Sequence, residues 1–174
     1  LATDALADLG GVLADLPPEA IAALDRVLPS TWSRANPVDI IGDAGPDRYA
    51  QSLEVVMNDR ASDAVLVMNC PTALSSSEDA AKVVVAADAK RKQVRGTSKP
   101  VLTNWLGDAE AESSRELFTK AGIPTFDTPD AAVNGFMHLV RYNPAPGTLP
   151  APPPSLPAGR ASAARRPGSR TSAP

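Results

Sequence analysis

The chain has 174 residues, with 17 Lys and Arg against 20 Asp and Glu, seven aromatic residues, one His and one Cys. A single cysteine excludes an intrachain disulfide and a cysteine-based zinc cluster, and we expect no metal site in this chain. The composition is acidic and poor in aromatic residues, so it lacks the cluster of basic residues that is typical of a nucleic-acid-binding protein. No apolar run of 18 residues occurs, which predicts no membrane span and a cytoplasmic location.

The first 30 residues predict two helices around a short strand. Apolar residues recur at helical spacing over residues 1–9 until Gly10, and Val12 to Ala14 is a candidate strand. A second helix follows Pro18, because proline is favoured in the first turn of a helix, and it ends at Pro29.

Residues 36–59 predict a strand that leads into a helix. Val38 to Ile41 is a brief apolar run, the letters GDAG form a turn, and Pro46 opens the helix. Asp39 lies inside the apolar run, where a carboxylate is costly unless it is paired. We favour a solvent-facing or backbone-capping role for Asp39 over a functional one.

The stretch from Asp63 to Lys92 organises the chain. Ala64 to Met68 has the continuous apolar pattern of a buried parallel strand, and a Ser-rich loop then predicts a helix start at residues 75–77. A helix N-terminus at the carboxyl end of a parallel strand presents unpaired N–H groups and a positive dipole, so it can bind an anion. The serines can also act only as helix caps, which is the commoner role of such residues.

The remaining elements repeat the alternation of strand and helix. We predict strands at residues 101–104 and near Thr125, a helix that ends at Gly122, and a last helix capped by Thr128. His138 lies on this last helix without an acidic or nucleophilic partner nearby, so we assign it to the helix surface or the edge of the core.

Alternating strands and helices predict an α/β fold, a doubly wound parallel sheet. Residues 1–143 carry all 20 acidic side chains and 13 of the 17 basic ones, whereas residues 144–174 carry four Arg and nine of the 18 prolines. We therefore predict one domain over 1–143 and a disordered Pro/Ala/Arg-rich tail over 144–174.

Four motifs resemble, in order and spacing, the flavodoxin-like (succinyl-CoA synthetase-like) domain of ADP-forming acetate–CoA ligases. They are NPVDIIGDAGPDRYAQSLEVVMND, DAVLVMNCPTALSSSEDAA, KPVLTNWLGD and AGIPTFDTPDAAVNGFMHLVRY. The residues of these motifs are most similar to those of the long bacterial members of the family, which are often fused to a GNAT acetyltransferase domain. In that family a strand and a Gly-rich turn precede the helix that opens here at Leu1, so we expect the domain to be N-terminally incomplete and to lack its first strand.

The resemblance implies a role in acyl-CoA synthesis from an acid, CoA and ATP, through an acyl phosphate and a phosphohistidine. It places the phosphoryl group at the helix start that follows Asn69. The implied phosphate- or substrate-binding residues are Asn69, Thr72, Ala73, Leu74, Ser75 and Ser76. The resemblance assigns no catalytic side chain to this chain.

The remaining parts of the enzyme would come from elsewhere. ATP, Mg and CoA are implied for the complete enzyme, with CoA-binding and ATP-grasp domains as partners, and this chain alone is not expected to run the reaction or to hold a cofactor. A non-catalytic, ligase-like regulatory module of a protein acetyltransferase is the alternative. A receiver-like or flavin-binding protein ranks last, because Asp39, Asp43 and Asp63 give no convergent acidic cluster.

Overall fold

The computed structural model describes residues 1–93 and 99–142. The predicted tail at 144–174, and with it the expected domain boundary, lies outside these residues. Six helices and three strands are described. They are α1 (Ala2–Asp8), α2 (Pro18–Leu24), α3 (Pro46–Asn58), β1 (Val65–Asn69), α4 (Ser77–Lys92), β2 (Val101–Trp105), α5 (Ala109–Ala121), β3 (Thr125–Phe126) and α6 (Pro129–Tyr142).

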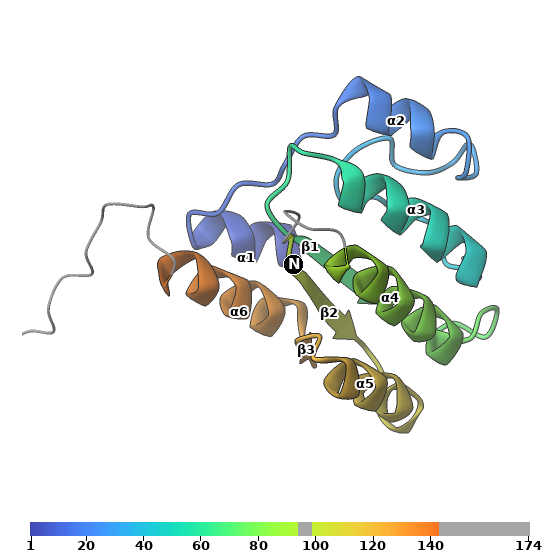
Figure 1. Cartoon of the computed structure of the whole chain (residues 1–174), viewed down its shortest axis with the longest axis vertical. Coiled ribbons are helices and arrows are strands. Elements are labelled where there is room, and N and C mark those ends of the chain that lie inside the picture. The colour runs from blue at the N-terminus through green and yellow to red at the C-terminus, as the bar shows by residue number, and fades with distance from the viewer. Residues whose placement is uncertain (94–98, 143–174) are drawn as a thin grey trace, which may run out of the picture. The chain divides into compact units, whose positions relative to one another are not determined.

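The three strands form one parallel sheet in the order β1-β2-β3. β1 and β2 are paired over their full length, from Val65 opposite Val101 to Asn69 opposite Trp105, whereas β3 pairs with β2 at two positions. Helices α3, α4 and α5 lie on one face of the sheet, and α1 and α6 lie on the other (Figure 1). Helices on both faces of a parallel sheet confirm the predicted α/β, flavodoxin-like fold class.

The main core lies between the sheet and the layer of α3, α4 and α5. Trp105 at the end of β2 is fully buried, and its ring meets that of Phe118 edge to face at a centroid distance of 4.8 Å. Its indole N–H donates to the carbonyl of Ser77 at 3.2 Å. Trp105 therefore packs the core and also fixes the start of α4, because its one polar atom is bonded to that turn.

Two of the predicted helix boundaries are confirmed, and each of them depends on one residue. Gly122 adopts a left-handed conformation (φ 68°) directly after α5, and the following Ile123 N–H donates to the Phe118 carbonyl at 2.9 Å. Thr128 precedes α6, and its hydroxyl accepts the Ala131 N–H at 3.1 Å. The glycine tolerates the positive φ that ends one helix, and the threonine side chain replaces a missing backbone acceptor at the start of the next.

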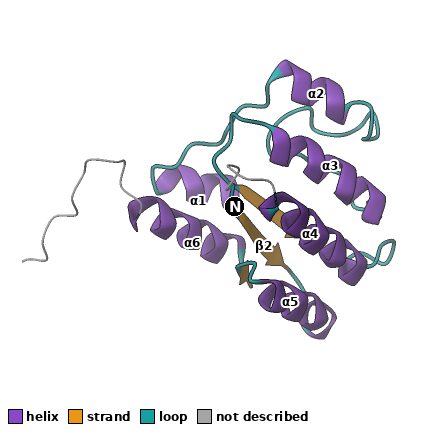
Figure 2. Cartoon of the chain, viewed as in Figure 1, coloured by secondary structure: helices purple, strands orange, loops and turns teal. Residues whose placement is uncertain are grey.

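The strands predicted at residues 12–14 and 38–41 are wrong, and both segments are loop (Figure 2). The Asp39 N–H donates to the Ser33 hydroxyl at 3.2 Å, and the Ile41 N–H donates to the Asp39 carboxylate at 2.8 Å. Ile41 also has a φ of 67°, a left-handed conformation that a strand cannot contain. Local side-chain bonds have replaced a strand ladder, and Asp39 has the backbone-capping role favoured from the sequence.

The N-terminal segments instead form a small cluster of their own. Leu24, Leu28 and Trp32 are buried together, and Val38 and Ile40 pack against them. The apolar run at 38–41 is therefore used in packing, without a hydrogen-bonded neighbour in the sheet, whereas Val12 and Leu13 are exposed.

Candidate functional site

The candidate site lies at the carboxyl edge of the sheet, where β1 leads through residues 70–76 into α4. The Leu106 N–H donates to the Asn69 carbonyl at 2.9 Å, so the ends of β1 and β2 are held together just before their loops diverge. In open α/β sheets this edge is where ligands bind, because strand ends and helix starts converge there.

A chain of side-chain hydrogen bonds fixes the start of α4. The Asn69 amide is buried and donates to the Tyr49 hydroxyl at 2.9 Å, while its oxygen accepts from the Ser77 hydroxyl at 2.9 Å. Burial raises the pKa of Tyr49, so the phenol stays neutral and can accept this bond. These two hydrogen bonds join α3, β1 and α4, and they hold the first turn of α4 in place relative to the sheet.

Ser76 is the N-cap of α4, which confirms the helix start predicted at residues 75–77. Its hydroxyl accepts the Asp79 N–H at 3.1 Å, and its carbonyl accepts the Ala80 N–H at 3.1 Å. The amides of Ser77 and Glu78 precede these two in the first turn, where a helix has no intrahelical acceptors. These two amides are the donors that the turn offers to a ligand, because the proton of the Ser76 hydroxyl is bonded to the Asp79 carboxylate.

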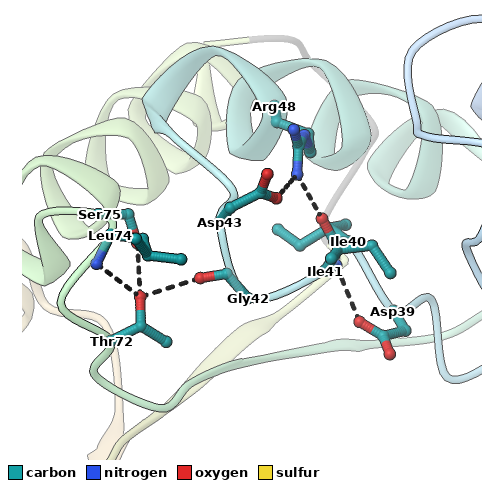
Figure 3. Close-up of polar contacts among 9 residues, drawn as sticks. All are labelled: Asp39, Ile40, Ile41, Gly42, Asp43, Arg48, Thr72, Leu74 and Ser75. Atoms are coloured by element: carbon teal, nitrogen blue, oxygen red, sulfur yellow. Dashed lines mark hydrogen bonds and ion pairs between the residues drawn. The ribbon is translucent and has the colours of Figure 1, made fainter.

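The Thr72 side chain connects the 70–76 loop to the segment before α3 by a hydrogen bond (Figure 3). Its hydroxyl donates to the Gly42 carbonyl at 2.9 Å, lies 3.4 Å from the Ser75 hydroxyl, and accepts the Leu74 N–H at 3.4 Å. A hydroxyl has one proton, so Thr72 has no further proton to donate to a ligand. Thr72 therefore shapes the loop, and in its contact with Ser75 the Ser75 hydroxyl is the donor.

Ala73 and Leu74 form the exposed tip of this loop, and the Leu74 side chain is 76% exposed. An apolar side chain at such a tip contributes no polar contact to an anion. Ala73 and Leu74 are therefore suited to supply backbone or packing contacts only.

A paired charge lies beside this loop. Arg48, on the first turn of α3, donates to the Ile40 carbonyl at 3.1 Å and to the Asp43 carboxylate (Figure 3). The hydrogen bond from Arg48 holds the pKa of Asp43 below its usual range. The Asp43 carboxylate is thus ionised but neutralised by its partner, which limits its repulsion of a nearby anion.

The first turn of α4 carries two acids of its own. Lys82 lies 2.9 Å from a Glu78 oxygen and 3.1 Å from an Asp79 oxygen. The bond from Lys82, helped by that from Ser76, lowers the pKa of Asp79, and Glu78 and Asp79 together raise that of Lys82. The two acids are directed to this lysine and complement the helix dipole, while the amides ahead of them remain at the helix end.

Four of the residues predicted for the site, Asn69, Thr72, Ser75 and Ser76, have hydrogen-bonding roles in the strand-loop-helix unit. Sequence reasoning missed three other participants, Tyr49, Ser77 and Gly42. Ser77 is one of the serines expected to cap α4, and no local sequence pattern singles out Tyr49. Only the three-dimensional contact between the 39–45 segment and the 70–76 loop reveals Gly42.

The described residues contain no group of three or more His, Cys, Asp or Glu placed to hold a metal ion. None of the helices in residues 1–93 and 99–142 is long and apolar enough to cross a membrane.

Fold and site together define an α/β domain with a helix start at the carboxyl edge of a parallel sheet. The Ligase-CoA domain family matches residues 1–142, and the chain belongs to this family.

Two curated relatives are ADP-forming ligases. Acetate–CoA ligase [ADP-forming] I of Archaeoglobus fulgidus is 32% identical over 143 residues, which cover 82% of this chain and 19% of the relative. Acetate–CoA ligase [ADP-forming] of Methanocaldococcus jannaschii is 31% identical over 143 residues, 82% of this chain and 20% of the relative. The chain thus spans about a fifth of the length of these relatives.

A solved structure has the same fold. The dinucleotide forming acetyl-coenzyme A synthetase 1 of Ca. Korarchaeum cryptofilum, in complex with phosphate and ADP, has a TM-score of 0.73 and 30% sequence identity. The match covers 81% of this chain and 30% of that chain. Its apo form matches equally well.

Proposed function

We propose that this chain is the phosphate-facing domain of an ADP-forming acyl-CoA (acetate–CoA) ligase. In this role the start of α4 stabilises an acyl phosphate or phosphohistidine that is supplied together with other domains. Membership in the Ligase-CoA family and the acetate–CoA ligase relatives support the reaction class. The single observation that carries the site is the first turn of α4, with two amides free of intrahelical acceptors.

The donors at this turn fit a phosphoryl group. The amides of Ser77 and Glu78 are of the kind that binds phosphate oxygens at helix N-termini, and the hydroxyls of Ser75 and Ser76 would join them only by leaving Thr72 and Asp79. The bond from the Ser77 hydroxyl to the Asn69 oxygen and the bond from the Trp105 indole to the Ser77 carbonyl would hold these donors in place before the anion arrives. Such preorganised dipoles stabilise developing negative charge without moving a proton.

The chain's contribution to the reaction is accordingly electrostatic. The complete enzyme would convert an acid, CoA and ATP into acyl-CoA, ADP and phosphate, with CoA-binding and ATP-grasp domains providing the other binding sites. Mg would be held with ATP by those domains. The residues of this chain would orient the phosphoryl group and offset its charge. The cytoplasmic location and a fusion to a GNAT acetyltransferase stay expectations of the same proposal.

The test is Ser75→Glu in a complete enzyme that carries this domain. A carboxylate at this position repels the phosphoryl group, whereas an acid near a helix start favours folding by about 0.3 to 1 kcal/mol. We expect ADP release dependent on acetate and CoA to fall by about 100-fold, equivalent to roughly 2.7 kcal/mol of transition-state stabilisation, with a melting temperature no lower than that of the parent.

Ser30→Glu is the matched control, because Ser30 is an exposed serine outside the site. It adds the same charge and should leave activity unchanged. Activity of the Ser75→Glu enzyme within about twofold of the parent would contradict the proposal.

A further inference from the structure

The Arg115 side chain on α5 holds the end of β2 and the turn that follows it. Its Nε and one terminal nitrogen donate to the Trp105 carbonyl at 3.2 Å and 2.7 Å, and the same terminal nitrogen donates to the Gly107 carbonyl at 3.0 Å. The other terminal nitrogen lies 3.3 Å from a carboxylate oxygen of Asp127, directly after β3. One guanidinium therefore binds two backbone carbonyls and a carboxylate at the carboxyl edge of the sheet.

These contacts engage all the nitrogens of the guanidinium. The Asp127 side chain is 80% exposed, so its ion pair adds little to stability, and the two carbonyls are the contacts with a fixed geometry. Arginine presents its donors in a planar fork, whereas lysine is a compact point charge on a flexible stem. With its donors engaged in this way, Arg115 is arranged to bind backbone and not the anion itself.

Both residues whose carbonyls Arg115 binds also contact the segment that leads into α4. The Trp105 indole N–H donates to the Ser77 carbonyl at 3.2 Å. Gly107 has a φ of 107°, and a Cβ at this position would lie 3.3 Å from the Cγ of Pro71. The glycine backbone therefore packs directly against the start of the 70–76 loop, in a conformation that other residues rarely adopt.

The residue between these two makes a third contact with the same segment. The Leu106 N–H donates to the Asn69 carbonyl at 2.9 Å, and the Asn69 side chain in turn accepts from the Ser77 hydroxyl. The carbonyls on either side of this amide are the ones that Arg115 binds. Any displacement of residues 105–107 would therefore be passed to the first turn of α4, and Arg115 restrains it.

We propose that Arg115 is a positioning residue for the anion site at the start of α4. It acts through the backbone of residues 105–107, and it needs the fork of a guanidinium as well as its charge. This inference rests on the phosphate-binding role proposed for α4. Without Arg115 the amides of Ser77 and Glu78 lose their fixed direction, and binding weakens because the donors must be ordered when the anion arrives.

The test is amide NMR of the full chain titrated with acetyl phosphate, well below the melting temperature of each variant. Arg115→Met should raise the Kd obtained from the Ser77 and Glu78 amides by about tenfold. Arg115→Lys should raise it by about threefold or more, because an ammonium group cannot reproduce the fork. Lys120→Met removes the same charge from an exposed position of the same helix and should leave the Kd unchanged.

A purely structural role would lower the melting temperature of Arg115→Met and leave the Kd of the folded chain unchanged, and that result overturns the proposal. Parent affinity in Arg115→Lys, or an equal loss in Lys120→Met, would assign the effect to charge alone and would also overturn it.

Hydrogen exchange of the Trp105 indole N–H in the free chain provides a second measurement that needs no ligand. This proton is bonded to the Ser77 carbonyl, so Arg115→Met should speed its exchange by about tenfold. Faster exchange in a chain whose parent shows no saturable shift with acetyl phosphate would reject the proposed function and retain the positioning of α4 by Arg115. Unchanged exchange overturns the positioning role.

Discussion

Residues 1–45 and 46–142 both carry short apolar runs beside predicted helices, but only the second region forms a sheet. In that region each strand has a parallel neighbour at a defined register. In the first region the backbone of the 38–41 run bonds to the side chains of Ser33 and Asp39, and its apolar residues pack against the cluster of Leu24 and Trp32. The difference teaches that an apolar run becomes a strand only where a neighbour completes its hydrogen bonds.

The largest expected effect comes from removing one tryptophan from each region. Trp105→Ala opens the core between Tyr49 and Phe118 and should cost about 3 to 5 kcal/mol of unfolding free energy. Trp32→Ala affects the separate cluster and should cost about half as much, because that cluster can open without breaking the sheet.

Urea unfolding followed by far-UV circular dichroism measures both values. If Trp32→Ala were as destabilising as Trp105→Ala, the first region would be an integral part of the same cooperative core. That result would contradict the difference between the two regions.

The next effect concerns the hydrogen-bond chain under α4. Asn69→Ala leaves the Tyr49 and Ser77 hydroxyls without their partner and should cost about 2 to 4 kcal/mol. Tyr49→Phe breaks only one of the two bonds and should cost about 1 to 2 kcal/mol. Asn134→Ala, at an exposed position of α6, is the control, expected within about 0.5 kcal/mol of the parent. If Asn69→Ala lowered the unfolding free energy by no more than the control does, the hydrogen bonds of Asn69 to Tyr49 and Ser77 would not hold α4 in place.

Sequence patterns predicted the second region well because its signals are local. The apolar run at 64–68, the serines before α4, Gly122 and Thr128 each determine one boundary through their own backbone or side-chain chemistry. They also located the helix start at Ser76. Patterns failed at 12–14 and 38–41, because strand formation depends on a neighbour that local sequence does not report. Tyr49 and Gly42 were missed for the same reason, since their site contacts join segments 20 and 30 residues apart.

The smallest effect is a titration in the first region. Asp25 accepts from the Trp32 indole at 2.8 Å and from Arg34 at 3.0 Å. The bond from Trp32 is the main cause that lowers the pKa of Asp25 in the folded chain. A lowered folded pKa gives stabilisation that is present above the unfolded pKa and is lost as the pH falls through the folded value.

The indole N–H signal of Trp32 in NMR spectra should therefore titrate with a midpoint below about 3.9, the ordinary value for Asp. Asp25→Asn should abolish the transition. A midpoint at or above the ordinary value would mean that this contact does not persist in solution.

The anion site at the start of α4 is tested most directly by amide NMR of the full chain titrated with acetyl phosphate, a soluble acyl phosphate. The account predicts saturable shifts of the Ser77 and Glu78 amides, and none at the start of α3, where the amides of Asp47 and Arg48 occupy another first turn. Titration with sodium chloride at matched ionic strength controls for salt. No saturable shift at Ser77 and Glu78, or a larger one at Asp47 and Arg48, would contradict the account.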